Sequence, residues 1–196
     1  TNMIHMFSEA ESFNQPINTK IVNQGQENEY TAWNVSNVTN MLLLFRDARE
    51  FDQLIDDWNV SNIINMSGMF EGARTFSKSI GKWNVSNVKN MDYMFWEASF
   101  FHEPINHWNV SNVTSMKGMF RGTLFFNQPI NDWNVSNVKN MNYMFSNTKR
   151  FNKPISDWDV SNVTNMIHMF SEAESFNQPI NTKIVNQGQE NEYTAW

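Results

Sequence analysis

The apolar residues of this chain recur in a fixed pattern with a period of 25 residues. Counting from a tryptophan at position 0, Val follows at +2, Met at +8, and Phe at +12 and +18. Such a repeat, here called a coil, cannot enclose its own apolar face and must stack on its neighbours. The position-0 tryptophans are therefore predicted to lie in the core. They are Trp33, Trp58, Trp83, Trp108, Trp133 and Trp158.

The spacing of the apolar residues within a coil predicts three elements. The stretch 155–160 contains a period-two step, which is typical of a strand. From 163 to 173 the apolar residues recur at three- and four-residue steps, as in a helix or a succession of 3₁₀ turns. Asn-Gln-Pro-Ile at 127–130 and 177–180 predicts a turn. The expected fold is an α/β solenoid with one short parallel β-strand, one short helix and one Pro turn per coil, strands lying about 4.8 Å apart.

The repeated frame resembles a known family. Phe-Asn-Gln-Pro-Ile-x-x-Trp-x-Val-Ser-Asn-Val-x-Asn-Met-x-x-Met-Phe is similar to the bacterial surface-protein repeat called PARCEL, which is akin to BspA-like leucine-rich repeats. The resemblance covers essentially the whole chain. It implies a right-handed leucine-rich-repeat-like stack, a cell-surface or extracellular location, and adhesion as the function usually suggested. It brings no catalytic residues with it.

A second, longer period accompanies the first. Residues 164–196 repeat residues 1–33 letter for letter, and the offset of 163 equals six coils plus 13 residues. The extra 13 residues are an insertion, Lys20–Ala32, which recurs as Lys183–Ala195. Insertions in repeat proteins loop out from one face and often carry function.

This arrangement predicts a single repeat domain over residues 1–196. The simplest interpretation is an excerpt from a tandem array of 163-residue super-units. The alternative is a chain whose matching ends associate head to tail. Either self-association or continuation of the array predicts fibres.

Composition excludes several classes of function. The formal charge of −6 disfavours a nucleic-acid partner, which requires a clustered basic face. The longest apolar run, Met41–Phe45, is far too short to span a membrane. The absence of cysteine excludes disulfides and thiolate metal sites.

No residue pattern indicates catalysis or a cofactor. The acidic residues, such as Asp56 and Asp57, have no paired partner for acid–base work, and no nucleophile elbow or phosphate-binding Gly loop occurs. We therefore expect neither an enzyme, a cofactor nor a metal site. The histidines lack ligand-like spacing; they are His5, His102, His107 and His168.

Polar positions recur as regularly as the apolar ones. Asn at +1, +4 and +7 and Ser at +3 return in nearly every coil, and stacked Asn side chains can form hydrogen-bonded ladders between coils and satisfy turn backbone groups. The alternative is a flat Asn/Ser face that matches a repeating ligand such as a polysaccharide. The predicted ladder comprises Asn34, Asn59, Asn84, Asn109 and Asn134 with Ser36, Ser61, Ser86, Ser111 and Ser136.

Three aromatic residues lie outside the core frame. Trp96, Phe100 and Phe125 are predicted either to form one exposed interaction patch or to be partly buried between adjacent coils. The leading functional hypothesis is a surface or extracellular spacer, stalk or filament. The alternative is an adhesin that binds a host glycan or protein through the Asn/Ser face or the Trp96 patch.

Overall fold

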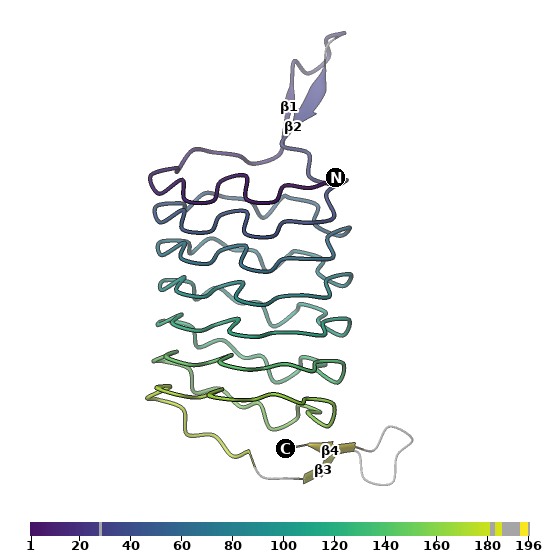
Figure 1. The fold of residues 1–196 in the computed structure, drawn as a ribbon. Coiled ribbons are helices and arrows are strands. Elements are labelled where there is room, and N and C mark those ends of the chain that lie inside the picture. Colours follow the sequence, from purple (N-terminus) through teal and green to yellow (C-terminus); the bar gives the residue numbers. More distant parts are fainter. Residues whose placement is uncertain (28, 181–182, 186–192, 196) are drawn as a thin grey trace.

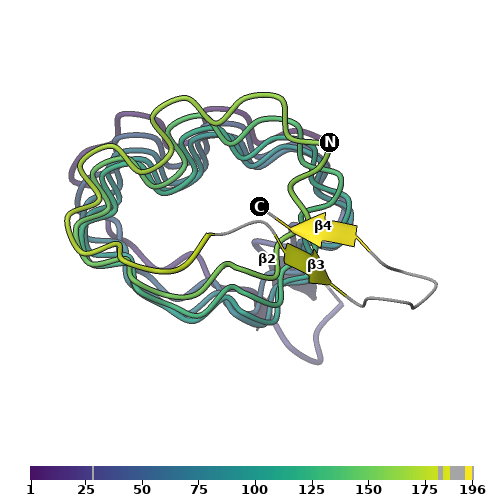
Figure 2. The same cartoon turned by 90° about the horizontal axis from the view of Figure 1, so that it is seen from below.

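Successive coils lie directly on one another in the computed structural model, which describes residues 1–27, 29–180, 183–185 and 193–195. Seen along the stack, the coils follow nearly the same closed outline (Figure 2). Equivalent residues are joined by single-residue parallel bridges at position +7. The bridges run in order through Asn2, Asn40, Asn65, Asn90, Ser115, Asn140 and Asn165.

The strands of the described residues all belong to the two insertions. β1 (Lys20–Val22) pairs antiparallel with β2 (Tyr30–Ala32), with Lys20 opposite Ala32. β3 (Lys183–Val185) pairs with β4 (Tyr193–Ala195) in the same register. The hairpin of β1 and β2 projects from the coil stack at its N-terminal end (Figure 1). Of the second predicted insertion, residues 186–192 lie outside the described part of the chain.

The predicted α/β solenoid with a leucine-rich-repeat-like strand and helix in each coil is wrong. The described residues contain no helix, and no coil contains a strand beyond its single bridge residue. The stretch 155–160, predicted as a strand, has no strand. Residues 163–173, predicted as a helix or a succession of 3₁₀ turns, contain a series of turns with no helical segment. The turn predicted at 127–130 and 177–180 is absent, and these residues have no regular structure.

Consecutive β-turns replace the helix because the backbone N–H groups donate to carbonyls three residues back or to carbonyls of the next coil, and not to carbonyls four residues back. Met69 N–H donates to Met66 O at 3.1 Å, and Ala73 N–H to Phe70 O at 3.1 Å, each three residues back. Gly68 and Gly72 have φ of 58° and 68° within these turns, and a positive φ at the third residue is typical of a type II turn. The side chain of Asn65 accepts from Ser67 N–H at 2.9 Å and starts the series as an Asx turn.

The remaining N–H groups bind the next coil. In each pair of neighbours, positions +8, +10, +12 and +14 of one coil donate to the carbonyls of +7, +9, +11 and +13 of the following coil. Between the first two complete coils these bonds are Met41 N to Asn65 O at 3.0 Å, Leu43 N to Ser67 O at 2.9 Å, Phe45 N to Met69 O at 2.9 Å and Asp47 N to Glu71 O at 2.6 Å. Over positions +7 to +14, each coil therefore has a donor edge and an acceptor edge, whereas at +6 the later coil donates to the earlier one, as Ile64 N does to Thr39 O at 2.8 Å.

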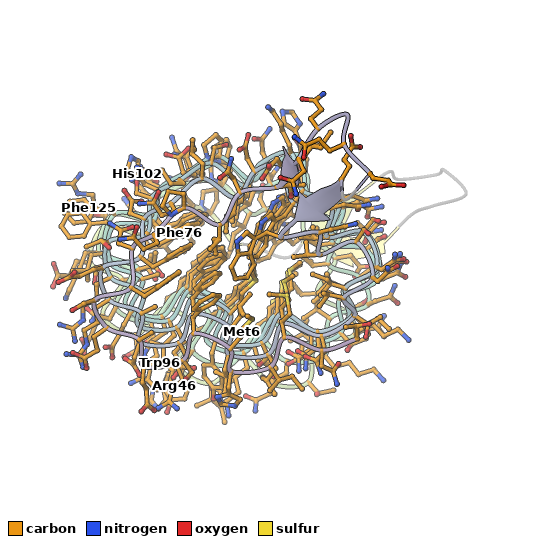
Figure 3. All side chains as sticks on the ribbon, turned by 90° about the horizontal axis from the view of Figure 1, so that it is seen from above. Met6, Arg46, Phe76, Trp96, His102 and Phe125 are labelled. Atoms are coloured by element: carbon orange, nitrogen blue, oxygen red, sulfur yellow. The ribbon has the colours of Figure 1, made fainter. Side chains whose placement is uncertain are left out.

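Columns of stacked rings fill the interior. Phe45 lies parallel to Phe70 of the next coil at 5.6 Å between ring centroids, and Phe51 to Phe76 at 5.9 Å. Within one coil, Phe70 and Phe76 stack at 4.1 Å. All four of these rings are fully buried, and Figure 3 shows Phe76 inside the ring of coils. These columns continue from coil to coil and form one core.

Glycine at +10 allows a large side chain of the preceding coil to lie across it. A Cβ at Gly118 would come within 2.7 Å of the Tyr93 ring, and a Cβ at Gly68 within 2.2 Å of Leu43. Both distances are too short for a real Cβ contact. The two glycine-containing coils therefore alternate with coils that carry Leu43, Tyr93 or Tyr143 at this position.

Candidate interaction surfaces

The predicted core tryptophans point inward and cannot contact a ligand. Trp58, Trp83, Trp108, Trp133 and Trp158 are 0–4% exposed, and Trp33 is partly buried. Each of the five buried indole Nε1–H groups donates to the carbonyl of an isoleucine that lies 28 residues earlier, or 41 residues earlier for Trp58, where the insertion intervenes. The acceptors are Ile17, Ile55, Ile80, Ile105 and Ile130, at 2.9–3.2 Å.

The Asn and Ser side chains at +1 and +3 interact within their own coil. Asn59 Oδ1 accepts from both the N–H and the hydroxyl of Ser61, at 3.2 and 2.7 Å. The bonds between coils come from position +4, where Asn62 Nδ2 donates to the Ser36 carbonyl at 2.7 Å. The same bond recurs from Asn87, Asn112, Asn137 and Asn162 to Ser61, Ser86, Ser111 and Ser136.

A second polar column, at +19, was not recognised from the sequence. Asp52 N–H donates to Asn14 Oδ1 at 3.0 Å, and Asn177 N–H to Asn152 Oδ1 at 2.9 Å. The signal for it was the Asn of the Phe-Asn-Gln-Pro motif, which was predicted only as part of a turn. The amides of both columns are therefore engaged in holding coils together.

A shallow, open groove of ≈ 400 Å³ runs along the +4 and +6 positions of three coils. Its lining is amide, hydroxyl and aliphatic, with one cation. The lining residues are Asn37, Thr39, Asn62, Ile64, Asn87 and Lys89. A surface of this kind suits an extended polar ligand better than a compact small molecule, because it is open to solvent and does not enclose its occupant.

The three aromatic residues predicted as one patch occupy two places. Phe100 stacks on Phe125 with 5.1 Å between ring centroids, and the Arg150 guanidinium lies 4.3 Å from the Phe125 ring centre. Phe100 is 51% exposed. Trp96 lies on a different side of the ring of coils from Phe125 (Figure 3). It is half-buried.

Trp96 belongs to a cluster of rings and cations. The Arg121 guanidinium lies 5.0 Å from the Trp96 ring and 5.1 Å from the Tyr143 ring. Lys117 Nζ lies 5.2 Å from the Tyr93 ring, and hydrogen bonding to the Tyr93 side chain raises the pKa of Lys117. Tyr93, Lys117 and Tyr143 were not predicted from the sequence; the alternation of Tyr and Gly at +10 was the available signal.

Carboxylates line a hollow of ≈ 140 Å³ beside Trp96. Asp47, Glu71 and Glu97 surround it, and Gly72 leaves the space open because it has no side chain. Burial raises the pKa of Glu71; the charge of Arg46 opposes this, and the charges of Asp47 and Glu97 add to it. Arg46 contacts Glu71 at 3.6 Å and Asp47 at 3.5 Å, so the acids are partly neutralised.

These surfaces offer packing, hydrogen bonding and charge. In the part of the chain that the structure describes, no group of three His, Cys, Asp or Glu side chains is arranged to hold a metal ion. Nor does any helix of sufficient length and apolar character to cross a membrane occur among those residues.

Comparison with known proteins places the chain in a repeat family. Neither the curated proteins nor the solved structures include a match. The sequence pattern of one family matches three overlapping stretches, residues 1–27, 19–123 and 99–194. The match supports the repeat character predicted from the sequence, but not the PARCEL or BspA-like assignment. Because these stretches together cover nearly the whole chain, it belongs to the family described as Mycoplasma protein of unknown function, DUF285.

Proposed function

We propose that this chain is a non-enzymatic structural spacer, a segment of a stalk or filament in which the stack of coils is itself the working part. The observation that carries the proposal is the continuity of the stack. Every coil donates a row of backbone N–H groups to the next, and the same columns of buried Phe rings run through all of them.

Such a stack resists bending because several separate sets of hydrogen bonds join each coil to the next. Backbone bonds join neighbouring coils at +8 to +14, Asn side chains join them at +4, and the buried Trp side chains join them at position 0. Bending the stack would have to break one of these sets. A rod of fixed cross-section is what a spacer requires.

The length of the rod tests this proposal. A chain with two 163-residue units in tandem should be longer than a chain with one by six coils, about 29 Å at 4.8 Å per coil. Small-angle X-ray scattering should give this increase with an unchanged cross-section radius. Two units that fold back on each other would thicken the particle instead, and that result would contradict the proposal.

We further propose a cell-surface or extracellular location, which the sequence resemblance supports. Protease treatment of intact cells that express the native protein should remove it while cytosolic markers remain. Full protection from protease on intact cells, with digestion after lysis, would argue against this location.

An adhesin is the second candidate, favoured by the Phe100–Phe125 pair, in which Phe100 is exposed, and by the shallow +4/+6 groove. Phe100→Ala should leave the unfolding curve almost unchanged, because half of this ring is already exposed. The same change should weaken attachment to host cells or to arrayed glycans if this pair makes the contact. Unchanged attachment of both Phe100→Ala and Phe125→Ala would exclude the pair as an adhesive site.

A further inference from the structure

Formal charge is unevenly distributed along the stack. Residues 108–157, two consecutive coils here called the basic band, contain six Lys or Arg and two Asp residues, a net charge of +4, whereas the whole chain has −6. The coils on both sides are acidic. Residues 83–107 contain three acids and one Lys, and residues 158–182 contain three acids and no Lys or Arg. The cations of the basic band are Lys117, Arg121, Lys139, Lys149, Arg150 and Lys153.

The cations of the basic band differ from those of the preceding coils in their partners. In residues 33–107, most cations lie 2.6–3.9 Å from a carboxylate oxygen; these are Arg46, Arg49, Arg74, Lys78 and Lys82. In the basic band, Lys149 contacts Glu174. The other five cations of the band have no carboxylate within 4 Å among the residues that the structure describes. The band therefore presents positive charge that the chain itself leaves unneutralised.

Aromatic rings hold two of these guanidinium groups. Arg121 lies 5.0 Å from the ring of Trp96 in the preceding coil and 5.1 Å from the ring of Tyr143 in the following coil. Arg150 lies 4.3 Å from the centre of the Phe125 ring. Neither guanidinium donates a hydrogen bond to an acceptor in the described part of the chain. Both are thus positioned by rings while their planar forks of N–H donors stay available, and such a fork binds a carboxylate or a sulfate in bidentate fashion.

The acids on either side of Trp96 in the sequence are engaged elsewhere. Asp92 Oδ1 accepts from Lys117 N–H at 2.8 Å and also from the Ser115 hydroxyl. Glu97 lies 3.9 Å from Arg74. An anion that reaches Arg121 therefore does not have to displace an ion pair.

The width of the basic band favours a linear polymer as its partner. Two coils span about 10 Å of the rod, a distance comparable to the Debye length in physiological salt. A flat anionic membrane along the rod would also face the acidic coils on both sides and be repelled by them. A nucleic acid has a phosphate at every residue and meets the same repulsion. A polymer with an acid group on every second residue can cross the band with little charge over its acidic flanks.

The side chains beside Arg121 suit a sugar. Trp96 and Tyr143 are half-buried, so part of each ring stays exposed next to the guanidinium. The C–H groups of a sugar can pack on this apolar surface while its acid group binds the guanidinium. We propose that the basic band binds an acidic polysaccharide, with Arg121 as the principal contact to its acid groups and Arg150 as the second. This inference rests on the adhesin candidate and names its class of ligand.

Binding of two labelled acidic polysaccharides tests the proposal. Hyaluronate has one carboxylate per disaccharide, and chondroitin sulfate has a sulfate in addition. The natural chain should bind at least one of them at low ionic strength, added salt should release it, and neutral dextran should not bind. Failure to bind both acidic polymers, or equal binding of dextran, would overturn the proposal.

Arg121→Gln removes the charge and the donor fork. We expect it to lower the affinity for the bound polymer by roughly 10- to 100-fold, the loss of charged hydrogen bonds. The matched control is Arg46→Gln, which changes the same +13 position and should leave the affinity unchanged, because the Arg46 guanidinium already has carboxylate partners. These partners are Glu9, Asp47 and Glu71. Equal affinities of the two variants would contradict the proposal.

A second variant keeps the test valid if Arg121→Gln does not fold. Arg150 is exposed, so Arg150→Gln should keep the thermal unfolding curve and still weaken binding several-fold. Unchanged affinity of a folded Arg150→Gln chain would remove Arg150 from the site. Poly-glutamate and anionic phospholipid vesicles are the competing ligands. Tighter binding of either than of both polysaccharides would overturn the proposal in favour of an acidic peptide or a membrane.

The adhesin candidate and this inference fail in different ways. Attachment to host cells that persists in excess hyaluronate and chondroitin sulfate, and in Arg121→Gln, would keep the adhesin and overturn this class of ligand. No attachment by the natural chain, with polysaccharide binding intact, would reject the adhesin and keep the basic band as a binding site. The spacer function depends on the scattering length alone and is unaffected by either result.

Discussion

The tryptophan at position 0 joins two coils through both parts of its side chain. The ring of Trp108 packs beside Phe95 at 6.4 Å, and its Nε1–H donates to the buried carbonyl of Ile80 at 3.1 Å. Another apolar residue could fill much of the space, but it would leave that carbonyl without a donor. A large side chain with a hydrogen-bond donor at one end is therefore favoured at this position.

Replacing Trp108 with Phe should test this double role. We expect the free energy of unfolding to fall by about 1–3 kcal/mol from the unpaired carbonyl, with an added cost for the lost ring volume. Urea denaturation followed by circular dichroism measures the change. Trp33→Phe is the matched control, and it should cost less because Trp33 is only partly buried. Equal losses would contradict the role of the hydrogen bond.

Asp92 compensates for the one coil that lacks Asn at +7. In the other complete coils, the +7 Asn side chain accepts from the +9 N–H, as Asn90 does from Asp92 at 2.7 Å. Ser115 has no amide oxygen, and Lys117 N–H donates instead to Asp92 Oδ1 at 2.8 Å. The Ser115 hydroxyl also donates to this carboxylate.

A double substitution tests this compensation. Asp92→Ala should lower the free energy of unfolding by about 1–3 kcal/mol, because it removes the acceptor of a part-buried N–H. Ser115→Asn in the same chain should recover most of the loss by restoring the Asx turn. Chemical denaturation of the two single variants and the double variant measures the coupling. Additive effects would show that the two residues act independently.

At the scale of the element, the spacing of the apolar residues is compatible with two backbone conformations, a series of turns and a helix. In the turn series, residues +8, +11, +12 and +15 point inward, as Met66, Met69, Phe70 and Ala73 do. A helix buries the same spacing. The apolar pattern therefore predicts the core and the period of the stack, but it cannot distinguish a helix from consecutive turns. The Asn at +7 and the glycines at +10 and +14 favour turns, whereas the positive φ of Tyr93 and Glu97 is not visible in the sequence.

The predicted surface fails for a similar reason. Trp96 and Phe100 are four residues apart, which would place them on one face of a helix. In the turn series Ala98 is buried between them, and Phe100 stacks on Phe125, which lies on a different side of the stack from Trp96 (Figure 3). Which Asn binds a neighbouring coil likewise depends on side-chain direction. The 25-residue period of the sequence predicts where Asn recurs, but not which group each Asn side chain hydrogen-bonds.

The column of charges beside Trp96 should make stability depend on pH. Burial raises the pKa of Glu71 in the folded chain, so the folded state holds this proton more strongly than the unfolded state. The contribution of Glu71 to stability is therefore greatest below its unfolded-state pKa and is lost as pH rises through the folded-state value.

Glu71→Gln removes this titration. We expect the unfolding free energy of the variant, relative to the natural chain, to increase as pH rises from about 4 to 7. Urea denaturation at several pH values measures the difference. Glu9→Gln, which also removes a carboxylate beside Arg46, is the control for loss of charge in general. Parallel pH profiles for Glu71→Gln and the natural chain would rule out this effect.

At the scale of the whole molecule, the insertion interrupts the chain without interrupting the stack. Thr19 Oγ1 donates to the Trp33 carbonyl at 3.4 Å, across the 13 residues of Lys20–Ala32. Lys20 pairs with Ala32 where the hairpin of β1 and β2 leaves the coil. The two flanking coil segments therefore already meet at the base of the hairpin, and the columns of rings continue past it, as in the contact of Phe7 with Phe45.

Deleting Lys20–Ala32 should therefore leave the stack intact, because it joins Thr19 to Trp33 and restores the 25-residue period. We expect the melting temperature to change by no more than about 4 °C, the shift that roughly 1 kcal/mol produces at this size. Deleting 84–96 removes the same number of residues from within a coil, misaligns every column, and should abolish cooperative unfolding. Thermal unfolding followed by circular dichroism compares the two. If both deletions unfold the chain, the hairpin is part of what holds the first coil in place, and its projection from the stack is not evidence of a separate role.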